Sequence, residues 1–146
     1  AHLAARPERI SLGTGAVVLP SNNPLRVAEK ASLVDDLCGG RLLLGLGRGL
    51  ARREYDRMGV AMDESRDRFD EAAAMVIRAL DSGTIEGTGP YYPQPAAPIR
   101  PRPARSFADR LYCVAMSPDS VLTAAEPNTP AAPSSSCAFQ LVIWFG

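Results

Sequence analysis

Two apolar segments of this chain contain small residues and one arginine that together could hold a cofactor carrying a phosphate. Small residues would let a planar ring lie close to the backbone, and an arginine between glycines could bind a phosphate through two hydrogen bonds. In order along the chain, these residues are Thr14, Gly15 and Ala16 in LGTGAVVLP, then Gly45, Gly47, Arg48 and Gly49 in GGRLLLGLGRGL. Both segments are typical of strands, so the residues would lie near strand ends.

A third feature that could bind an anion follows a later apolar segment. Ser117 stands before Pro118, a pattern typical of a helix start, where a hydroxyl and free backbone N–H groups can hold an anion. Each of the three features also has a purely structural explanation: small residues in a tightly packed strand, an arginine in solvent, and a serine that only caps its helix. Their occurrence at three strand ends of one sheet favours the cofactor hypothesis.

The elements that must position these residues begin with a strand–helix–strand unit. Ser11 to Leu19 is nearly all apolar, which predicts a strand buried on both faces. Asn23 followed by proline predicts a helix start, and the pair Gly39–Gly40 predicts its end. The apolar positions of this helix are Val27, Ala28, Ala31, Val34 and Leu37. Leu42 to Leu46 is a second buried strand, parallel to the first because a helix connects them.

The next part of the chain is more polar and richer in proline. The charged segment LARREYDRMGVAMDES predicts a loop. Asp63 is expected to cap a helix with an apolar stripe that ends at Ser82–Gly83. Six prolines within residues 84–110 exclude a central strand there and indicate a surface connection with a small hairpin around Tyr91–Tyr92.

The fold class follows from the alternation of strands and helices. Leu111 to Ala115 predicts a further buried strand, followed by a helix that reaches Glu126. Such an alternation predicts an α/β fold with a parallel sheet, either an open doubly wound sheet or a (β/α)8 barrel. Residues 1–126 form this unit. Residues 127–146 are a tail rich in proline, alanine and serine, with an apolar end that is too short to span a membrane and has no assigned role.

Composition and charge exclude several classes of protein. With 46% hydrophobic and 22% charged residues, the chain is expected to be soluble and globular, with no membrane as partner. Its formal net charge of zero argues against nucleic acid as a partner. The three cysteines lie far apart, which favours a reducing cytoplasm over a disulfide framework or a zinc site.

Motifs of hydrolases and nucleotide kinases are missing from the sequence. It contains no Ser/His/Asp constellation and no Walker loop, and GLGRGL lacks the third glycine of a dinucleotide-binding fingerprint. The single histidine, His2, and the carboxylates Asp35 and Asp36 are expected to face solvent. A phosphate-bearing cofactor therefore stays the leading hypothesis.

Four segments of the chain resemble, in register, the bacterial luciferase-like flavin monooxygenases: GTGAVVLP, NPLRVAE, GGRLLLGLGRG and SRDRFDEA. The resemblance covers roughly Leu3 to Glu126. It implies a (β/α)8 barrel that binds reduced FMN, or in one branch a deazaflavin, at the carboxyl ends of its strands. Ile10–Pro20, Arg41–Leu46 and Leu111–Ala115 would be the third, fourth and fifth strands. The barrel would then be incomplete, without its first two and last three strands.

The resemblance also implies roles for individual residues. The Gly15–Ala16 peptide would be a cis bond beneath the flavin ring, and Arg48 would lie near the flavin phosphate. Met116 would lie by the ring, while Ser117 and Ser120 would lie on the phosphate side. Gly47 and Met116 stand where the light-emitting luciferases have a cysteine and a glutamate, so a general luciferase-like oxidoreductase is the closer match. The candidate cofactor-binding residues are Thr14, Gly15, Ala16, Gly47, Arg48, Met116, Ser117 and Ser120.

Two functional hypotheses follow. In the first, the protein is a flavin-dependent monooxygenase or oxidoreductase that holds reduced FMN or a deazaflavin, supplied by a separate reductase, and acts on a small organic substrate. In the second, the chain is an inactive remnant, or at most a dimerising or cofactor-holding module. An incomplete barrel would expose strand edges and apolar faces, which favours self-association into a homodimer.

Overall fold

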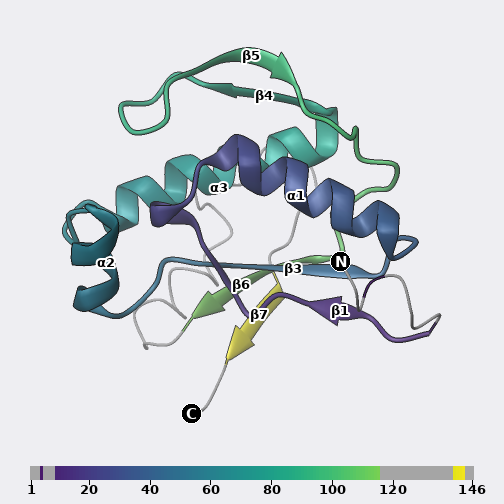
Figure 1. Cartoon of the computed structure of the whole chain (residues 1–146), viewed down its shortest axis with the longest axis horizontal. Helices are drawn as coiled ribbons and strands as arrows, with labels where there is room; N and C mark the ends of the chain where they lie inside the picture. The colour runs from purple at the N-terminus through teal and green to yellow at the C-terminus, as the bar shows by residue number, and fades with distance from the viewer. Residues whose placement is uncertain (1–3, 5–8, 116–139, 144–146) are drawn as a thin grey trace.

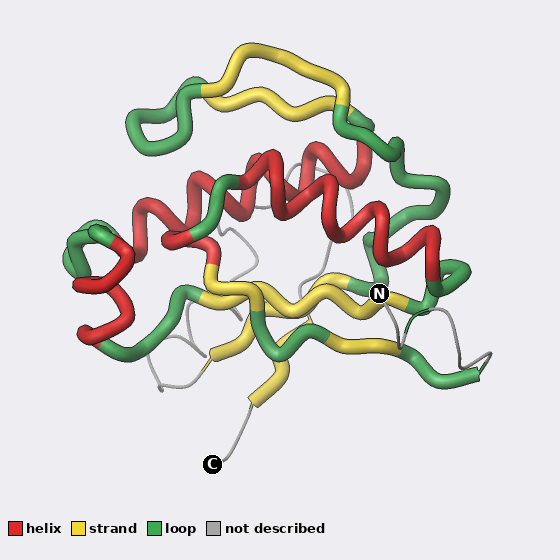
Figure 2. The backbone as a smooth tube through the Cα atoms, viewed as in Figure 1, coloured by secondary structure: helices red, strands yellow, loops and turns green. Residues whose placement is uncertain are grey.

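The structure is a computed structural model that describes Ala4, residues 9–115 and residues 140–143. A sheet, two long helices over one of its faces and a two-stranded hairpin over the helices form three layers (Figure 1). The tube in Figure 2 shows the same layers by type of element. The strands of the main sheet are β1 (Leu12–Gly13), β2 (Val17–Val18), β3 (Leu42–Gly47), β6 (Leu111–Ala115) and β7 (Gln140–Ile143). The other elements are the 3₁₀ turn η1 (Leu19–Ser21), the helices α1 (Pro24–Leu37), α2 (Arg52–Met58) and α3 (Ser65–Ser82), and the hairpin strands β4 (Thr84–Gly87) and β5 (Gln94–Pro98).

The strand pairs of the main sheet are parallel. β3 lies between β1 and β6, and β7 pairs with the other edge of β6. β2 also pairs with β3, beyond the end of β1, with Val17 opposite Leu46 and Val18 opposite Gly47. The predicted parallel strands joined by a helix are therefore confirmed. β7 belongs to residues 127–146, which the sequence sets apart as a tail.

The prediction of one continuous strand from Ser11 to Leu19 is wrong, because pairing is interrupted at residues 14–16. Thr14 still donates its backbone N–H to Leu43 O (3.1 Å). Its side chain then replaces the next ladder bonds, since Oγ1 accepts from Gly45 N (2.8 Å) and donates to Gly45 O (3.1 Å). Pairing resumes in β2, which is only partly buried, so the expectation of burial on both faces is also wrong.

Helix α1 begins and ends where the sequence predicts. The Asn23 side chain accepts the N–H of Arg26 (3.3 Å), and the helix ends before Gly39 and Gly40, whose φ angles of 67° and 86° lie in the left-handed region. The buried residues of α1 are Pro24, Val27, Ala28, Ala31, Ser32 and Asp35. The predicted core position Leu37 is instead 47% exposed, because the 3.6-residue repeat that buries Asp35 turns Leu37 outward.

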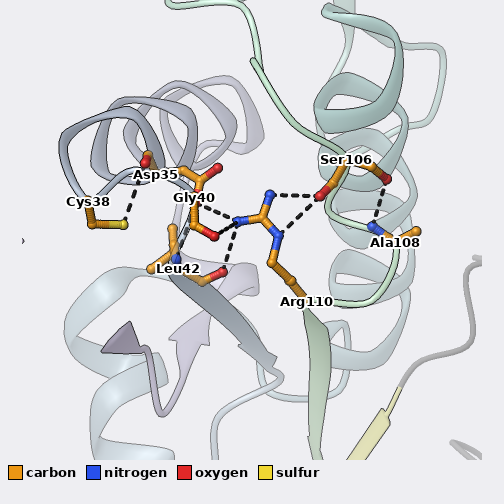
Figure 3. Close-up of polar contacts among 7 residues, drawn as sticks. All are labelled: Asp35, Cys38, Gly40, Leu42, Ser106, Ala108 and Arg110. Atoms are coloured by element: carbon orange, nitrogen blue, oxygen red, sulfur yellow. Dashed lines mark hydrogen bonds and ion pairs between the residues drawn. The ribbon is translucent and has the colours of Figure 1, made fainter. Parts of the chain in front are cut away.

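Asp35, expected to face solvent, is buried in an ion pair with Arg110 (Figure 3). Arg110 Nη1 lies 2.5 Å from Asp35 Oδ1, and the side chains of Arg110 and Asp35 are 16% and 3% exposed. The same carboxylate oxygen accepts the N–H of Leu42 (3.2 Å), and Arg110 Nη1 donates to the carbonyls of Gly40 and Leu42. The pair joins the end of α1 to the amino ends of β3 and β6.

The polar segment of residues 50–65, predicted as a loop, contains helix α2. This seven-residue helix buries only Tyr55, so its apolar pattern is too weak to indicate a helix. Helix α3 begins at Ser65 rather than after Asp63, whose carboxylate accepts the N–H of the next residue (3.1 Å) before the helix starts. The predicted end of α3 at Gly83 is confirmed by its φ of 79°.

The core lies between the sheet and the helices α1 and α3. The alternate leucines of β3, Leu42, Leu44 and Leu46, are buried in it. The predicted hairpin is confirmed, with β4 and β5 paired antiparallel. Glu71 of α3 accepts both backbone N–H groups of Tyr91–Tyr92 (3.1 and 2.7 Å), which fixes the hairpin to the helix. None of the helices in the described part of the chain combines the length and apolar character needed to cross a membrane.

Candidate functional site

Five of the eight candidate residues are described: Thr14, Gly15 and Ala16 lie between β1 and β2, and Gly47 and Arg48 lie at the carboxyl end of β3. A methyl group on Gly47 would lie 3.2 Å from Ala16 Cβ, so these two residues face each other across the strands. Arg48 directly follows β3 and is partly buried. Met116, Ser117 and Ser120 lie outside the described residues.

Thr14, the residue before Gly15, fixes the local backbone through its contacts with Gly45 of β3. The Gly15–Ala16 peptide is cis, as the resemblance implies. The Thr14 hydroxyl bonds to both the N–H and the C=O of Gly45, so its proton is committed to β3. A methyl group on Gly45 would lie 2.3 Å from the carbonyl oxygen of Thr14, which leaves room only for glycine there. Thr14 therefore contributes to the site by fixing its backbone.

A groove of 350 Å³ lies beside these residues, on the sheet face opposite the helices. Leu43 and Gly45 place it there, because they alternate with the core leucines of β3. A methyl group on either Gly13 or Gly15 would meet no atom within 4 Å, so the groove is open above both glycines. The lining carries no charged side chain and consists of Gly13, Thr14, Gly15, Leu43, Gly45, Tyr112 and Val114. The groove can receive a flat, uncharged ring system.

A second pocket, of 420 Å³, is lined by residues of β2, η1 and α2. Ala16 lines this pocket while Gly15 lines the groove, so the two hollows lie on either side of the Gly15–Ala16 peptide. The pocket has both apolar and charged walls, made by Ala16, Val17, Val18, Ser21, Asn22, Glu54, Tyr55, Arg57 and Met58.

Two arginines, Arg48 and Arg66, bring positive charge near Asp70 of α3. Burial raises the pKa of Asp70 on α3, and the charges of Arg66 and Arg48 both act to lower it. Burial also raises the pKa of the Cys113 thiol on β6, and Arg66 again acts to lower it. Arg66, the second residue of α3, is thus within electrostatic reach of both Asp70 and β6. A guanidinium group can bind a phosphate through two hydrogen bonds, so Arg48 and Arg66 are candidates for such a contact.

Three residues near the site are absent from the sequence-based prediction: Arg66, Asp70 and Tyr55. The sequence does contain a signal for Arg66. A helix that follows a parallel strand begins near the carboxyl end of that strand, and Arg66 lies in the first turn of such a helix. No comparable signal exists for Tyr55, because a single aromatic residue in a charged segment does not indicate that its side chain is buried.

The chain is similar to known proteins in both sequence and fold. The sequence profile of the family described as luciferase-like monooxygenase matches residues 1–135. The alkanal monooxygenase alpha chain of Aliivibrio fischeri is 32% identical over 102 residues, which cover 70% of this chain and 29% of that protein. The oxygenase component of a flavin-dependent trigonelline monooxygenase from Acinetobacter baylyi is 32% identical over 122 residues, covering 82% and 34%. The chain thus spans about a third of the length of the curated relatives it matches.

The fold is shared with a solved structure as well. The crystal structure of the monooxygenase RslO1 from Streptomyces bottropensis superposes with a TM-score of 0.73 at 30% identity, covering 83% of this chain and 36% of that one. The predicted α/β fold with a parallel sheet is confirmed, while closure into an eight-stranded barrel stays a prediction. Because the family profile matches well over half of its residues, the chain belongs to the luciferase-like monooxygenase family.

Proposed function

We propose that this protein is a flavin-dependent oxidoreductase or monooxygenase that binds FMN at the carboxyl edge of its sheet. The observation that carries the proposal is the uncharged groove along β1, β3 and β6, open above Gly13 and Gly15, with Arg48 directly after β3 and Arg66 in the first turn of α3. FMN joins a flat ring system to a phosphate, and the groove and the arginines match these two parts. The flavin-dependent monooxygenase among the relatives supports the same assignment.

Each residue of the proposed site has its own task. Gly15 and Ala16 leave space for the ring, and Gly47 lets Ala16 lie close to β3. Arg48 and Arg66 balance the charge of the phosphate. Met116, Ser117 and Ser120, proposed from the family resemblance, complete the site with a contact to the ring and two hydroxyl groups for the phosphate.

The described residues of the chain contribute binding and orientation of the flavin. When bound, reduced flavin supplies the redox chemistry, either hydride transfer or reaction with oxygen. Leu43, Tyr112 and Val114 form apolar walls beside the ring position. The absence of charge on these walls fits an uncharged portion of a small organic substrate. We further propose that a separate reductase delivers the reduced flavin and that the protein acts as a homodimer in the cytoplasm.

The contribution of Arg48 tests the proposed function. Arg48→Ala is expected to weaken FMN binding about 10- to 100-fold, because a charged hydrogen bond to the phosphate is worth about 1.5–3 kcal/mol. Riboflavin has the same ring and no phosphate, so its affinity should not change. Titration of each flavin with the protein, followed by flavin fluorescence, gives both dissociation constants.

Arg53→Ala is the matched control, since Arg53 is an exposed arginine on α2 that lines neither hollow. It should leave both affinities unchanged. Equal weakening of FMN and riboflavin by Arg48→Ala would contradict a phosphate contact. A deazaflavin carrying the same phosphate serves as a third ligand: preference for it over FMN would assign the chain to the deazaflavin branch.

A further inference from the structure

We infer that Tyr55 is a positioning residue that holds Arg48 in place for the flavin phosphate. The inference rests on the proposed function, in which Arg48 is the phosphate ligand. Tyr55 lines the pocket on the α2 side of the Gly15–Ala16 peptide, and it reaches the Arg48 backbone from a helix that follows Arg48 in the chain.

The contact between the two residues is a hydrogen bond from side chain to backbone. The Tyr55 hydroxyl donates to the carbonyl oxygen of Arg48. Tyr55 is only 3% exposed and Arg48 is partly buried, so the bond is partly shielded from competing water. A buried tyrosine hydroxyl needs such a partner, and here the partner is the backbone of the proposed phosphate ligand.

The next peptide is held from both sides. Gly49 has a φ of 90°, in the left-handed region. A methyl group on it would lie 2.9 Å from Val18 Cγ1 and 3.2 Å from the Tyr55 hydroxyl oxygen. The chain leaving Arg48 therefore passes through a narrow gap between β2 and Tyr55. This confinement limits the directions in which the Arg48 side chain can leave the backbone.

Helix α2 has little other function in the packing of the described structure. Tyr55 is its only buried residue, and Met58 at its end is 64% exposed. The helix lies between Gly49 and Gly59, both in the left-handed region. The charged segment after β3 thus forms a short helix whose inward contact is the one with Arg48 and β2.

Tyr55→Phe tests this role, because it keeps the buried ring and removes only the hydroxyl. We expect FMN to bind about three- to tenfold more weakly, the equivalent of one lost hydrogen bond, with riboflavin affinity unchanged. Both affinities are measured on the full chain by titration of flavin fluorescence. The ratio of the two separates phosphate positioning from general damage, which would weaken both ligands.

Tyr92→Phe is the matched control. The Tyr92 hydroxyl also donates to a backbone carbonyl, that of Pro20 (2.9 Å), and lies outside both hollows. Its loss should lower the melting temperature about as much as Tyr55→Phe does and leave both flavin affinities unchanged.

The outcomes separate this inference from the function on which it rests. The positioning role of Tyr55 is supported if the native chain binds FMN more tightly than riboflavin and the Tyr55→Phe variant loses part of that preference. Two results would overturn the positioning role while the proposed function stands. In both, the native chain prefers FMN, but Tyr55→Phe either retains the full preference or weakens the binding of FMN and riboflavin equally. If the native chain binds neither flavin, the proposed function fails and the role of Tyr55 fails with it.

Discussion

Asp35→Ala is expected to lower the free energy of unfolding by about 3–5 kcal/mol, because it leaves the charge of Arg110 without its partner in a mostly buried position. The substitution also removes the acceptor of the Leu42 N–H at the start of β3. The end of α1 would lose its connection to both β3 and β6. Unfolding in urea, followed by circular dichroism, measures the change.

Asp36→Ala is the control for this prediction. Asp36 is the neighbouring carboxylate on the same helix, but it is exposed, so its removal should change stability little. A second check replaces both partners, as Asp35→Leu with Arg110→Leu. The double variant should lose less stability than the sum of the two single ones, since neither charge is then left unpaired. Equal effects of Asp35→Ala and Asp36→Ala would contradict the importance of the ion pair.

Gly45→Ala is the second substitution with a large expected effect, a loss of about 3 kcal/mol or more. The added methyl group would lie 2.3 Å from the carbonyl oxygen of Thr14, a backbone atom that cannot move without disturbing β1 and β3. The two hydrogen bonds between the Thr14 hydroxyl and Gly45 would be strained or lost at the same time. Urea unfolding again provides the measurement.

Gly13→Ala distinguishes this local clash from a general cost of adding a methyl group to the sheet. Gly13 lines the same groove, and its added methyl group would meet no atom within 4 Å. The Gly13→Ala variant should be as stable as the native chain or slightly more stable, because alanine has less backbone freedom than glycine in the unfolded chain. A comparable loss in both variants would show that the Thr14–Gly45 contact is not the cause.

Features with local causes could be predicted from the sequence. The boundaries of α1 follow from the Asn23 cap and from the two glycines after the helix, and the end of α3 follows from Gly83. Each depends on residues within one or two turns of the boundary. The parallel arrangement of β1 and β3 follows in the same way from the helix that connects them.

Features that depend on distant contacts could not be predicted. Asp35 and Arg110 are 75 positions apart, so nothing near Asp35 in the sequence shows that it is paired and buried. The break at Thr14 depends on the register that brings its hydroxyl to Gly45. The small residues and Arg48 at the strand ends were predictable by type. The position of Tyr55 against Arg48 requires the path of α2 in three dimensions.

The most direct test of the proposed cofactor site is calorimetric titration of FMN into the native chain and into Gly15→Leu. A methyl group at Gly15 meets no protein atom within 4 Å, so the larger side chain should project into the groove and leave the melting temperature nearly unchanged. We expect one FMN per native chain and at least tenfold weaker binding, about 1.4 kcal/mol, in the variant. Absence of FMN binding to the native chain, or equal binding by a folded Gly15→Leu variant, would contradict a flavin ring above Gly15.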